Sequence, residues 1–127
     1  MLYLPGISKR WAAVEFLLDT GAGSSVVHPL DATTRLGIDD VALRTPSLWP
    51  IQRTAHGIGG SSAEYSVPAH YALQRDDGTR ATHREDLAIA RPTPANQTLP
   101  SPLGWDILRH YRLVADWNAL TIRLETP

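Results

Sequence analysis

Frequent interruption by proline and glycine is the feature that most limits how this chain can fold. Ten prolines and nine glycines are spread over 127 residues, and short runs rich in Val, Ile, Leu, Tyr and Trp lie between them. Proline removes a backbone donor and glycine favours turns, so both residues tend to end regular elements. The pattern therefore favours several short strands joined by turns over a helical bundle.

The apolar periodicity within these runs predicts the first elements. A strand is expected from about Lys9 to Leu18, because apolar residues alternate along one face of it. Residues 65, 67, 69, 71 and 73 also alternate at period two, and Pro68 among them suggests an edge position or a break. The dipeptide Asp77-Gly78 predicts a hairpin turn.

Further short elements are expected along the rest of the chain. Leu36–Leu43 is ambiguous between helix and strand, and Arg91–Pro102 holds four prolines and is expected to be a loop. The segment LGWDILRHY is the only one with a good helical pattern. Strands are expected on both sides of HGIGGSS, and at Leu87–Ala90, Arg112–Ala115 and Leu120–Leu124.

Composition limits the class of function. The formal net charge is −1, from 12 basic and 13 acidic residues spread along the chain, which argues against a nucleic-acid or membrane surface. There is no cysteine, so disulfides, zinc–thiolate sites and thiol catalysis are excluded. The five histidines show no metal-ligand spacing, and neither a metal nor another cofactor is expected.

Length and hydropathy predict a single domain over residues 1–127. The opening stretch, MLYLPGISKR, lacks the long apolar core of a signal peptide. No apolar run approaches the roughly 20 residues that a membrane helix needs. On these grounds the expected localisation is cytoplasmic.

Asp19 stands out because it directly follows an apolar run, in FLLDTGAGSSVV. One interpretation is a plain turn, since Asp and Gly are both favoured there. The apolar residues on both sides of Asp-Thr-Gly argue against a solvated turn. The glycine-rich segment HGIGG follows about 40 residues later, and PLGWDIL later still.

These three segments, in this order, resemble the retropepsin family of aspartic proteases. The resemblance is carried by Phe16–Val27, His56–Gly60 and Leu103–Leu108, and it extends over about Lys9 to Leu124. It implies an all-β fold, a closed and mostly antiparallel barrel with one short C-terminal helix. It also implies a homodimer that acts as an aspartic endopeptidase on peptide or protein substrates.

The implied chemistry needs two carboxyls, and this chain has one Asp-Thr-Gly motif. Two carboxyls held about 3 Å apart share one proton, and the ionised one activates a water for attack on the peptide bond. The only other Asp in a comparable apolar strand is Asp116, which Trp117-Asn118 follows. The second catalytic Asp19 would therefore come from a second copy of the chain. Of the remaining aspartates, Asp106 is interpreted as a helix-dipole partner and the others as solvated surface or turns: Asp31, Asp39, Asp40, Asp76, Asp77 and Asp86.

Other residues take roles through the resemblance. Thr20 would hydrogen-bond across the two-fold axis, and Gly21 would allow close backbone approach to the substrate. Ala22 completes the catalytic loop, and Gly104 would pack behind it, where a side chain would not fit. A flap that closes over the substrate would be formed by His56, Gly57, Ile58, Gly59 and Gly60, with Ile58 at its tip. The alternative for these last residues is an ordinary glycine-rich hairpin.

The sequence departs from the family at one place. Many retropepsins have an Arg after the Gly of the second motif, paired with an Asp near the first; here those positions are Trp105 and Gly23. Charge and partner are absent together, so no buried charge is left unpaired. Two other interpretations stay open: a non-catalytic dimer that binds a peptide or partner, and a β domain cut from a larger enzyme.

Overall fold

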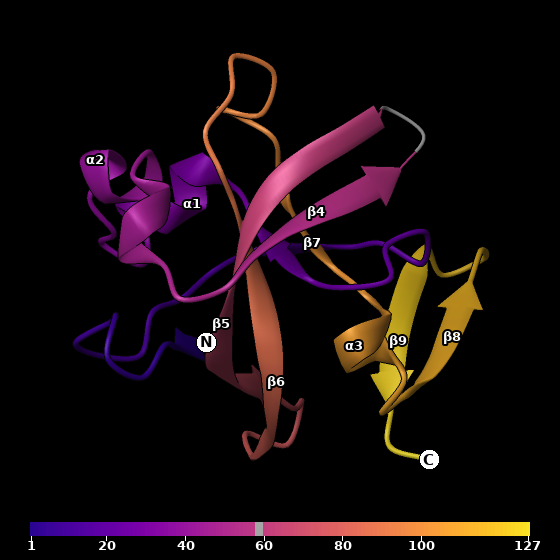
Figure 1. Ribbon diagram of the computed structural model, residues 1–127. Coiled ribbons are helices and arrows are strands. Elements are labelled where there is room, and N and C mark those ends of the chain that lie inside the picture. The colour runs from indigo at the N-terminus through magenta and orange to yellow at the C-terminus, as the bar shows by residue number, and fades with distance from the viewer. Residues whose placement is uncertain (58–59) are drawn as a thin grey trace.

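Strands dominate the computed structural model, which describes residues 1–57 and 60–127 (Figure 1). The strands are β1 (Leu2–Tyr3), β2 (Phe16–Leu18), β3 (Val26–Val27), β4 (Gln52–Gly57), β5 (Gly60–Gln74), β6 (Arg80–Ala90), β7 (Ser101–Leu103), β8 (Arg112–Asp116) and β9 (Thr121–Glu125). The helices are α1 (Pro29–Thr34), α2 (Asp40–Leu43), the 3-10 turn η1 (Pro46–Leu48) and α3 (Trp105–Leu108). The described residues contain no helix of the length and apolarity needed to cross a membrane.

The long β5–β6 hairpin is the centre of the fold. Its antiparallel register runs from Glu64 opposite Ala90 to Gln74 opposite Arg80. Strands β4 and β1 both pair antiparallel with β5, and β3 pairs parallel with β6. The parallel pair β2–β7 and the antiparallel pair β8–β9 form two further small sheets.

The expected closed barrel is therefore wrong for the described residues, although the mostly β content agrees with the prediction. A barrel needs one continuous ladder of hydrogen bonds around all its strands. Here β1 and β4 share one edge of β5, and neither β2–β7 nor β8–β9 joins the ladder of the central sheet.

Pro68 lies inside β5 without breaking it. The pairing of β5 with β4 ends at Tyr65, and its pairing with β1 begins at His70. Pro68 thus has a neighbouring strand only on the β6 side, where it stands opposite Asp86. A residue that cannot donate a backbone hydrogen bond is tolerated at such a gap, as the edge interpretation predicts.

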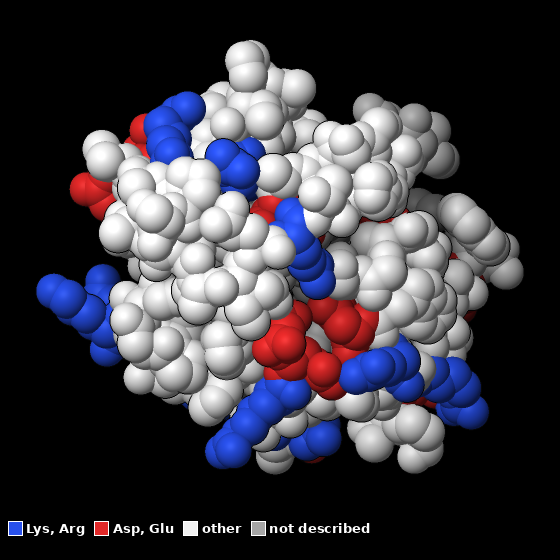
Figure 2. Space-filling view, viewed as in Figure 1, with Lys and Arg blue, Asp and Glu red and all other residues white. Residues whose placement is uncertain are grey.

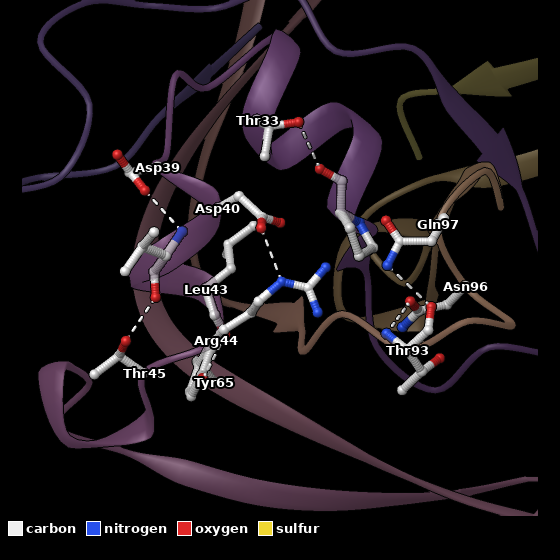
Figure 3. Close-up of polar contacts among 12 residues, drawn as sticks. Thr33, Asp39, Asp40, Leu43, Arg44, Thr45, Tyr65, Thr93, Asn96 and Gln97 are labelled. Carbon is white, nitrogen blue, oxygen red and sulfur yellow. Dashed lines mark hydrogen bonds and ion pairs between the residues drawn. The ribbon is translucent and has the colours of Figure 1, made fainter.

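Alternate residues of β5 build the core. Tyr65, Val67, Ala69 and Tyr71 are all buried, together with residues of β1, β3, β6 and α3. The Tyr65 ring stacks on that of Trp49 with centroids 4.5 Å apart, and its hydroxyl donates to the Leu43 carbonyl (Figure 3). The segment around α2 and η1 is held against the central sheet by these contacts.

Helices α1 and α2 correct the expectation of one short helix. Pro29 occupies the first turn of α1, where its missing N–H is not needed. Asp39 caps α2 by accepting a hydrogen bond from the Val41 amide at 2.7 Å, and Asp40 pairs with Arg44 (Figure 3). With six and four residues, the two helices are too short to show an apolar period in the sequence.

The expected strand at Lys9–Leu18 is also too long. Only Phe16–Leu18 forms a strand, and Ala12 makes an isolated bridge to Leu2. Val14 and Phe16 still pack against the core, as the alternation predicts, but among the described residues the stretch before Phe16 pairs with β1 only through the single Ala12–Leu2 bridge. Burial of one face thus produces alternation without a hydrogen-bond ladder.

Predictions about turns and the C-terminal region agree with the structure, except that Ser101 and Pro102 of the expected loop at Arg91–Pro102 belong to β7. Gly78 has a φ of 83° in the turn between β5 and β6, although the connection is longer than two residues. The loop before β7 is stabilised by Asn96, whose side chain accepts from the Thr93 amide (Figure 3). The strands β8 and β9 flank the expected turn, and α3 is a single helical turn inside LGWDILRHY.

Candidate active site

Asp19 lies immediately after β2, at the end of a parallel strand pair. Leu18 of β2 stands opposite Leu103 of β7, so Asp19 and Gly104 leave the two strands at the same level. The Asp19 amide donates to the Leu103 carbonyl at 3.1 Å. Parallel pairing thus brings the first and the third of the sequence segments together, although they lie far apart along the chain.

The Asp-Thr-Gly stretch forms a tight turn. The Gly21 amide donates to Oδ1 of Asp19 at 2.8 Å, and the Ala22 amide donates to the Asp19 carbonyl at 3.2 Å. A Cβ added at Gly21 would stand 3.1 Å from that carboxylate oxygen. Glycine therefore lets the backbone approach the carboxylate and hold its orientation.

Gly104 lies directly against the loop that begins at Asp19. A Cβ there would meet the Ser24 carbonyl carbon at 2.5 Å and the Ala22 oxygen at 2.8 Å. The next residue, Trp105, donates its backbone amide to the Ala22 carbonyl at 3.0 Å and its indole N–H to the Thr20 carbonyl at 2.8 Å. The two loops are thus in backbone contact, and only glycine fits at position 104.

The carboxylate of Asp106 holds the end of the same loop. The Ser25 amide and hydroxyl donate to its two oxygens at 2.8 and 2.7 Å, and the Gly104 amide donates to Oγ of Ser25 at 3.0 Å. Ser25 is completely buried. Sequence reasoning missed this pair and assigned Asp106 only to the helix dipole; the polar Ser25 directly before the apolar Val26-Val27 was the available signal.

Trp105 and Gly23 are the residues at which the resemblance to retropepsins would lead one to expect an Arg–Asp pair. The space around Gly23 is open, and a Cβ added there would have no atom within 4 Å. The loop is instead attached through the Trp105 indole and the Ser25–Asp106 contacts. Neutral donors and one carboxylate therefore hold this loop.

The environment of the loop differs between its two sides. On the buried side of the loop, burial raises the pKa of the Tyr71 phenol, and the negative charge of Asp106 raises that pKa further. On the solvent side of the loop, Thr20 and Gly21 are exposed, and Asp19 is half-buried. Asp19 is thus partly open to solvent, while the end of its loop is held by buried contacts.

The expected flap residues lie at the end of the β4–β5 hairpin, which projects from the central sheet (Figure 1). His56 pairs with Ser61, and Gly57 with Gly60, which has a φ of 110°. His56, Gly57 and Gly60 are exposed. The expected tip, Ile58, and its neighbour Gly59 lie outside the described residues.

Arg53 connects this hairpin to the loop that follows Asp19. Sequence analysis did not predict this contact. Its Nε donates to Oε2 of Glu64 at 3.0 Å, and its Nη2 donates to Oγ of Ser24 at 3.0 Å. Glu64 is buried, with a side chain only 4% exposed. Ser24 belongs to the loop between Asp19 and Ser25, so the root of the hairpin and the loop are held together.

Two other interpretations of the polar residues can be compared with the structure. Asp31, interpreted as solvated, is half-buried and accepts a hydrogen bond from the buried Ser101 hydroxyl at 2.6 Å. His28 meets Ser101 through its backbone amide, and its ring Nδ1 contacts the Pro100 carbonyl, so these residues do not form a nucleophilic triad. Within the described ranges, no group of three or more His, Asp or Glu residues is arranged to hold a metal ion.

Comparison of the chain with models of known protein families and with curated proteins gave no match.

Proposed function

We propose that this chain is an aspartic endopeptidase of the retropepsin type, in which two copies each contribute one Asp19. The observation that supports this best is the contact between the loops after β2 and β7. It leaves Asp19 half-buried at the end of the β2–β7 strand pair, on a base that Gly104 allows to pack closely. A plain solvated turn has no need of such a base.

The proposed reaction uses the two carboxyls as one unit. Held about 3 Å apart on a two-fold axis, they share a single proton. The ionised carboxylate takes a proton from a water as that water attacks the peptide carbonyl. The protonated carboxyl hydrogen-bonds the carbonyl oxygen and afterwards helps to protonate the leaving nitrogen. No covalent intermediate is required.

The other residues of the site would orient the reactants. The Gly21 amide, which donates to Asp19, fixes the position of the carboxylate. Thr20, exposed beside it, would contact its counterpart in the second copy. The β4–β5 hairpin would cover an extended peptide and exclude water from the reaction. The Arg53–Ser24 contact would keep the hairpin in register with the catalytic loop.

The test is cleavage of an unfolded protein substrate, followed by mass spectrometry. Asp19→Asn is expected to lower the rate by a factor of about 10²–10⁴ or more, since the amide can neither accept nor share the proton. Asp76→Asn, at an exposed site in the turn before Gly78, is the matched control and should keep the parent rate. Equal cleavage by the Asp19→Asn and parent chains would refute the proposal.

Dimerisation is a separate requirement that can be measured independently. Sedimentation of the active chain should give twice the 13.9 kDa of one copy. Full activity at concentrations where only the single copy exists would exclude a shared dyad.

A further inference from the structure

Two imidazole rings join β6 to the turn that follows α3, and α3 itself lies beside β6 (Figure 1). The His83 ring of β6 stacks on the His110 ring, with centroids 4.6 Å apart and an angle of 18° between the ring planes. Nε2 of His83 also lies 2.6 Å from the hydroxyl of Tyr111. All three residues are half-buried. The two histidines form an imidazole pair, which is part of the contact between the central sheet and the end of α3.

Charged groups face the imidazole pair from β6, from the end of β5 and from the turn after α3. Glu85 of β6 lies 3.0 Å from Nε2 of His110 and also pairs with Arg109. A proton on His110 therefore completes an ion pair with Glu85. A proton on His83 is opposed first by burial and then by the positive charges of His110 and Arg75, although Glu85 favours it. Both rings can thus be charged together only against electrostatic repulsion.

The neutral form of His83 fits its surroundings. Burial lowers the pKa of His83 below 6.5, and the charge of His110 lowers it further. Tyr71, opposite His83 on β5, is buried, and burial raises the pKa of its phenol, so this neighbour stays neutral as well. A conformer in which the His83 ring is hydrated binds a proton more readily, so a fall in pH shifts the population towards that conformer. Acid therefore favours separation of the imidazole pair.

Helix α3 is a single turn, so its end and its start are directly connected. Four residues, Trp105–Leu108, make up the whole helix. The His110 amide donates to the Ile107 carbonyl, and the Arg109 amide donates to the Trp105 carbonyl, both at 3.1 Å. A displacement of His110 is thus transmitted to Trp105 through the backbone of one turn.

The start of α3 holds the loop that follows Asp19. The Trp105 indole donates to the Thr20 carbonyl at 2.8 Å. The Asp106 carboxylate accepts from the amide and the hydroxyl of Ser25 at 2.8 and 2.7 Å. The imidazole pair and this loop are therefore attached to opposite ends of one helical turn.

We propose that the imidazole pair is a pH-sensitive switch that controls the order of the loop that follows Asp19. With His83 neutral, the stacked rings hold the end of α3 against β6, and Trp105 and Asp106 hold the loop. With both rings protonated, the pair separates, the single turn of α3 shifts, and the contacts with the loop weaken. The loosening of the loop does not depend on the proposed function; only its effect on cleavage rests on that function.

Two indole N–H groups report on the switch in an isotope-labelled chain. The Trp105 indole donates to the loop that follows Asp19, whereas the Trp49 indole donates to the Ala42 carbonyl at 2.8 Å in the segment around α2 and η1. NMR spectra are recorded from neutral to acidic pH, and the ring protons of His83 are followed in the same samples. The Trp105 signal is expected to move towards the position of a solvated indole, with its midpoint at the pH where His83 titrates. The Trp49 signal should stay in place.

Variants assign the response to the imidazole pair. His83→Gln introduces an amide that can still contact Tyr111 but carries no charge, so it should abolish the pH response of the Trp105 signal. His110→Gln should abolish it too, because the repulsion needs both rings. His70→Gln, which removes a histidine of β5 outside the pair, is the matched control and should leave the response unchanged.

Three results would disprove the switch. In the first, the Trp105 signal does not follow the titration of His83. In the second, the Trp105 and Trp49 signals move together, which means that the whole chain unfolds in acid. In the third, the response of the parent chain persists in both Gln variants of the imidazole pair.

Cleavage of a protein substrate by the same chains separates the switch from the proposed function. For an endopeptidase, the ratio of the parent rate to the His83→Gln rate should fall at the midpoint to about half of its value at neutral pH, because half of the parent molecules then have the loosened loop. Cleavage with a constant ratio overturns the control of activity and supports the proposed function. A Trp105 response without cleavage at any pH supports the switch and overturns the endopeptidase.

Discussion

At the scale of single residues, Gly104 is the position with the least freedom. Its φ of −100° is open to any residue, so space alone excludes a side chain. We expect Gly104→Ala to lower the free energy of unfolding by about 1–3 kcal/mol, because the methyl group would push the Ser24 backbone away. Urea denaturation measures the change.

Gly23→Ala is the matched control for that substitution. Gly23 belongs to the same loop, but a Cβ there meets no atom within 4 Å and the φ is not in the left-handed region. Its effect on the free energy of unfolding should stay within about 0.5 kcal/mol. Equal losses in both variants would mean that the loop tolerates no added atom at either position. That result would contradict close packing at position 104 as the specific cause.

Asp106 and Ser25 form the polar contact that fixes the other end of the loop. Asp106→Ala leaves the amide and the hydroxyl of Ser25 without their acceptor, whereas Ser25→Ala removes the hydroxyl and leaves one donor, the Gly104 amide, without its acceptor. We expect Asp106→Ala to cost about 1–3 kcal/mol of unfolding free energy for each unsatisfied group, and Ser25→Ala to cost less. The double variant should show a coupling energy of about 0.5–3 kcal/mol. Additive effects in urea denaturation would contradict a direct contact.

The residue scale also shows what the sequence could and could not reveal. The place of Asp19 at the end of a strand followed from its apolar neighbours, and the need for glycine at 104 followed from the resemblance. The roles of Asp106 and Arg53 depend on contacts with Ser25 and Ser24, far away along the chain. A carboxylate or a guanidinium in a local pattern gives no sign of such a distant partner.

At the scale of elements, β6 and the turn after α3 meet in a cluster of titratable side chains. The part of the surface over these elements carries acidic and basic side chains close together (Figure 2). His83 of β6 stacks on His110 with ring centroids 4.6 Å apart, and its Nε2 lies 2.6 Å from the Tyr111 hydroxyl. Glu85 pairs with both Arg109 and His110.

This cluster predicts how stability depends on pH. Burial lowers the pKa of His83 below 6.5, and the neighbouring charge of His110 lowers it further, while Glu85 acts in the opposite direction. The unfolded chain then binds more protons than the folded chain between the folded pKa and 6.5, so stability falls as the pH drops through this window. Thermal melts of the parent chain should show the decrease.

His83→Gln should flatten that part of the pH profile, and His56→Gln, on the exposed hairpin, should not. A second decrease is expected below pH 4.5, because hydrogen bonds from Arg109 and then His110 lower the pKa of Glu85. A parent profile that is flat from neutral pH down to 4.5 would refute the role of His83.

Element prediction succeeded where burial and hydrogen bonding agree, and failed where they do not. The β5 strand and the β8–β9 hairpin alternate in sequence and have a neighbouring strand. The stretch before Phe16 alternates but has only the single Ala12–Leu2 bridge to a neighbouring strand, so only three residues form β2. The helices α1 and α2 are stabilised by single features, Pro29 and the Asp39 cap, which are equally common in turns.

At the scale of the whole molecule, the least predictable feature is which strands share a sheet. The short segments β2 and β7 lie far apart in sequence and pair in parallel, and β3 joins β6 in the same manner. Two- and three-residue strands carry too few side chains to specify a partner by pattern. The resemblance supplied the order of the motifs, but the three separate sheets arise from these long-range pairings.

The β8–β9 hairpin makes a prediction about how two copies associate. It forms its own sheet, and Trp117 and Leu120 are each 84% exposed, with Ile122 at 60%. We expect these side chains to become buried in the proposed dimer, because large apolar side chains gathered on one hairpin are typical of an interface. Ile122→Ser should then raise the dissociation constant about tenfold or more, and deletion of residues 120–127 should raise it further.

Salt provides the complementary test of that association. Apolar burial is little affected by ionic strength, whereas exposed ion pairs are screened over about 8 Å in physiological salt. Sedimentation equilibrium at low and moderate salt should therefore give similar dissociation constants for the parent chain. The charge reversal Arg84→Glu, at an exposed site on β6, is the control and should weaken the dimer less than Ile122→Ser. A dimer that dissociates steeply with added salt, yet tolerates both Ile122→Ser and the deletion, would show that charged surfaces and not this hairpin bring the two Asp19 residues together.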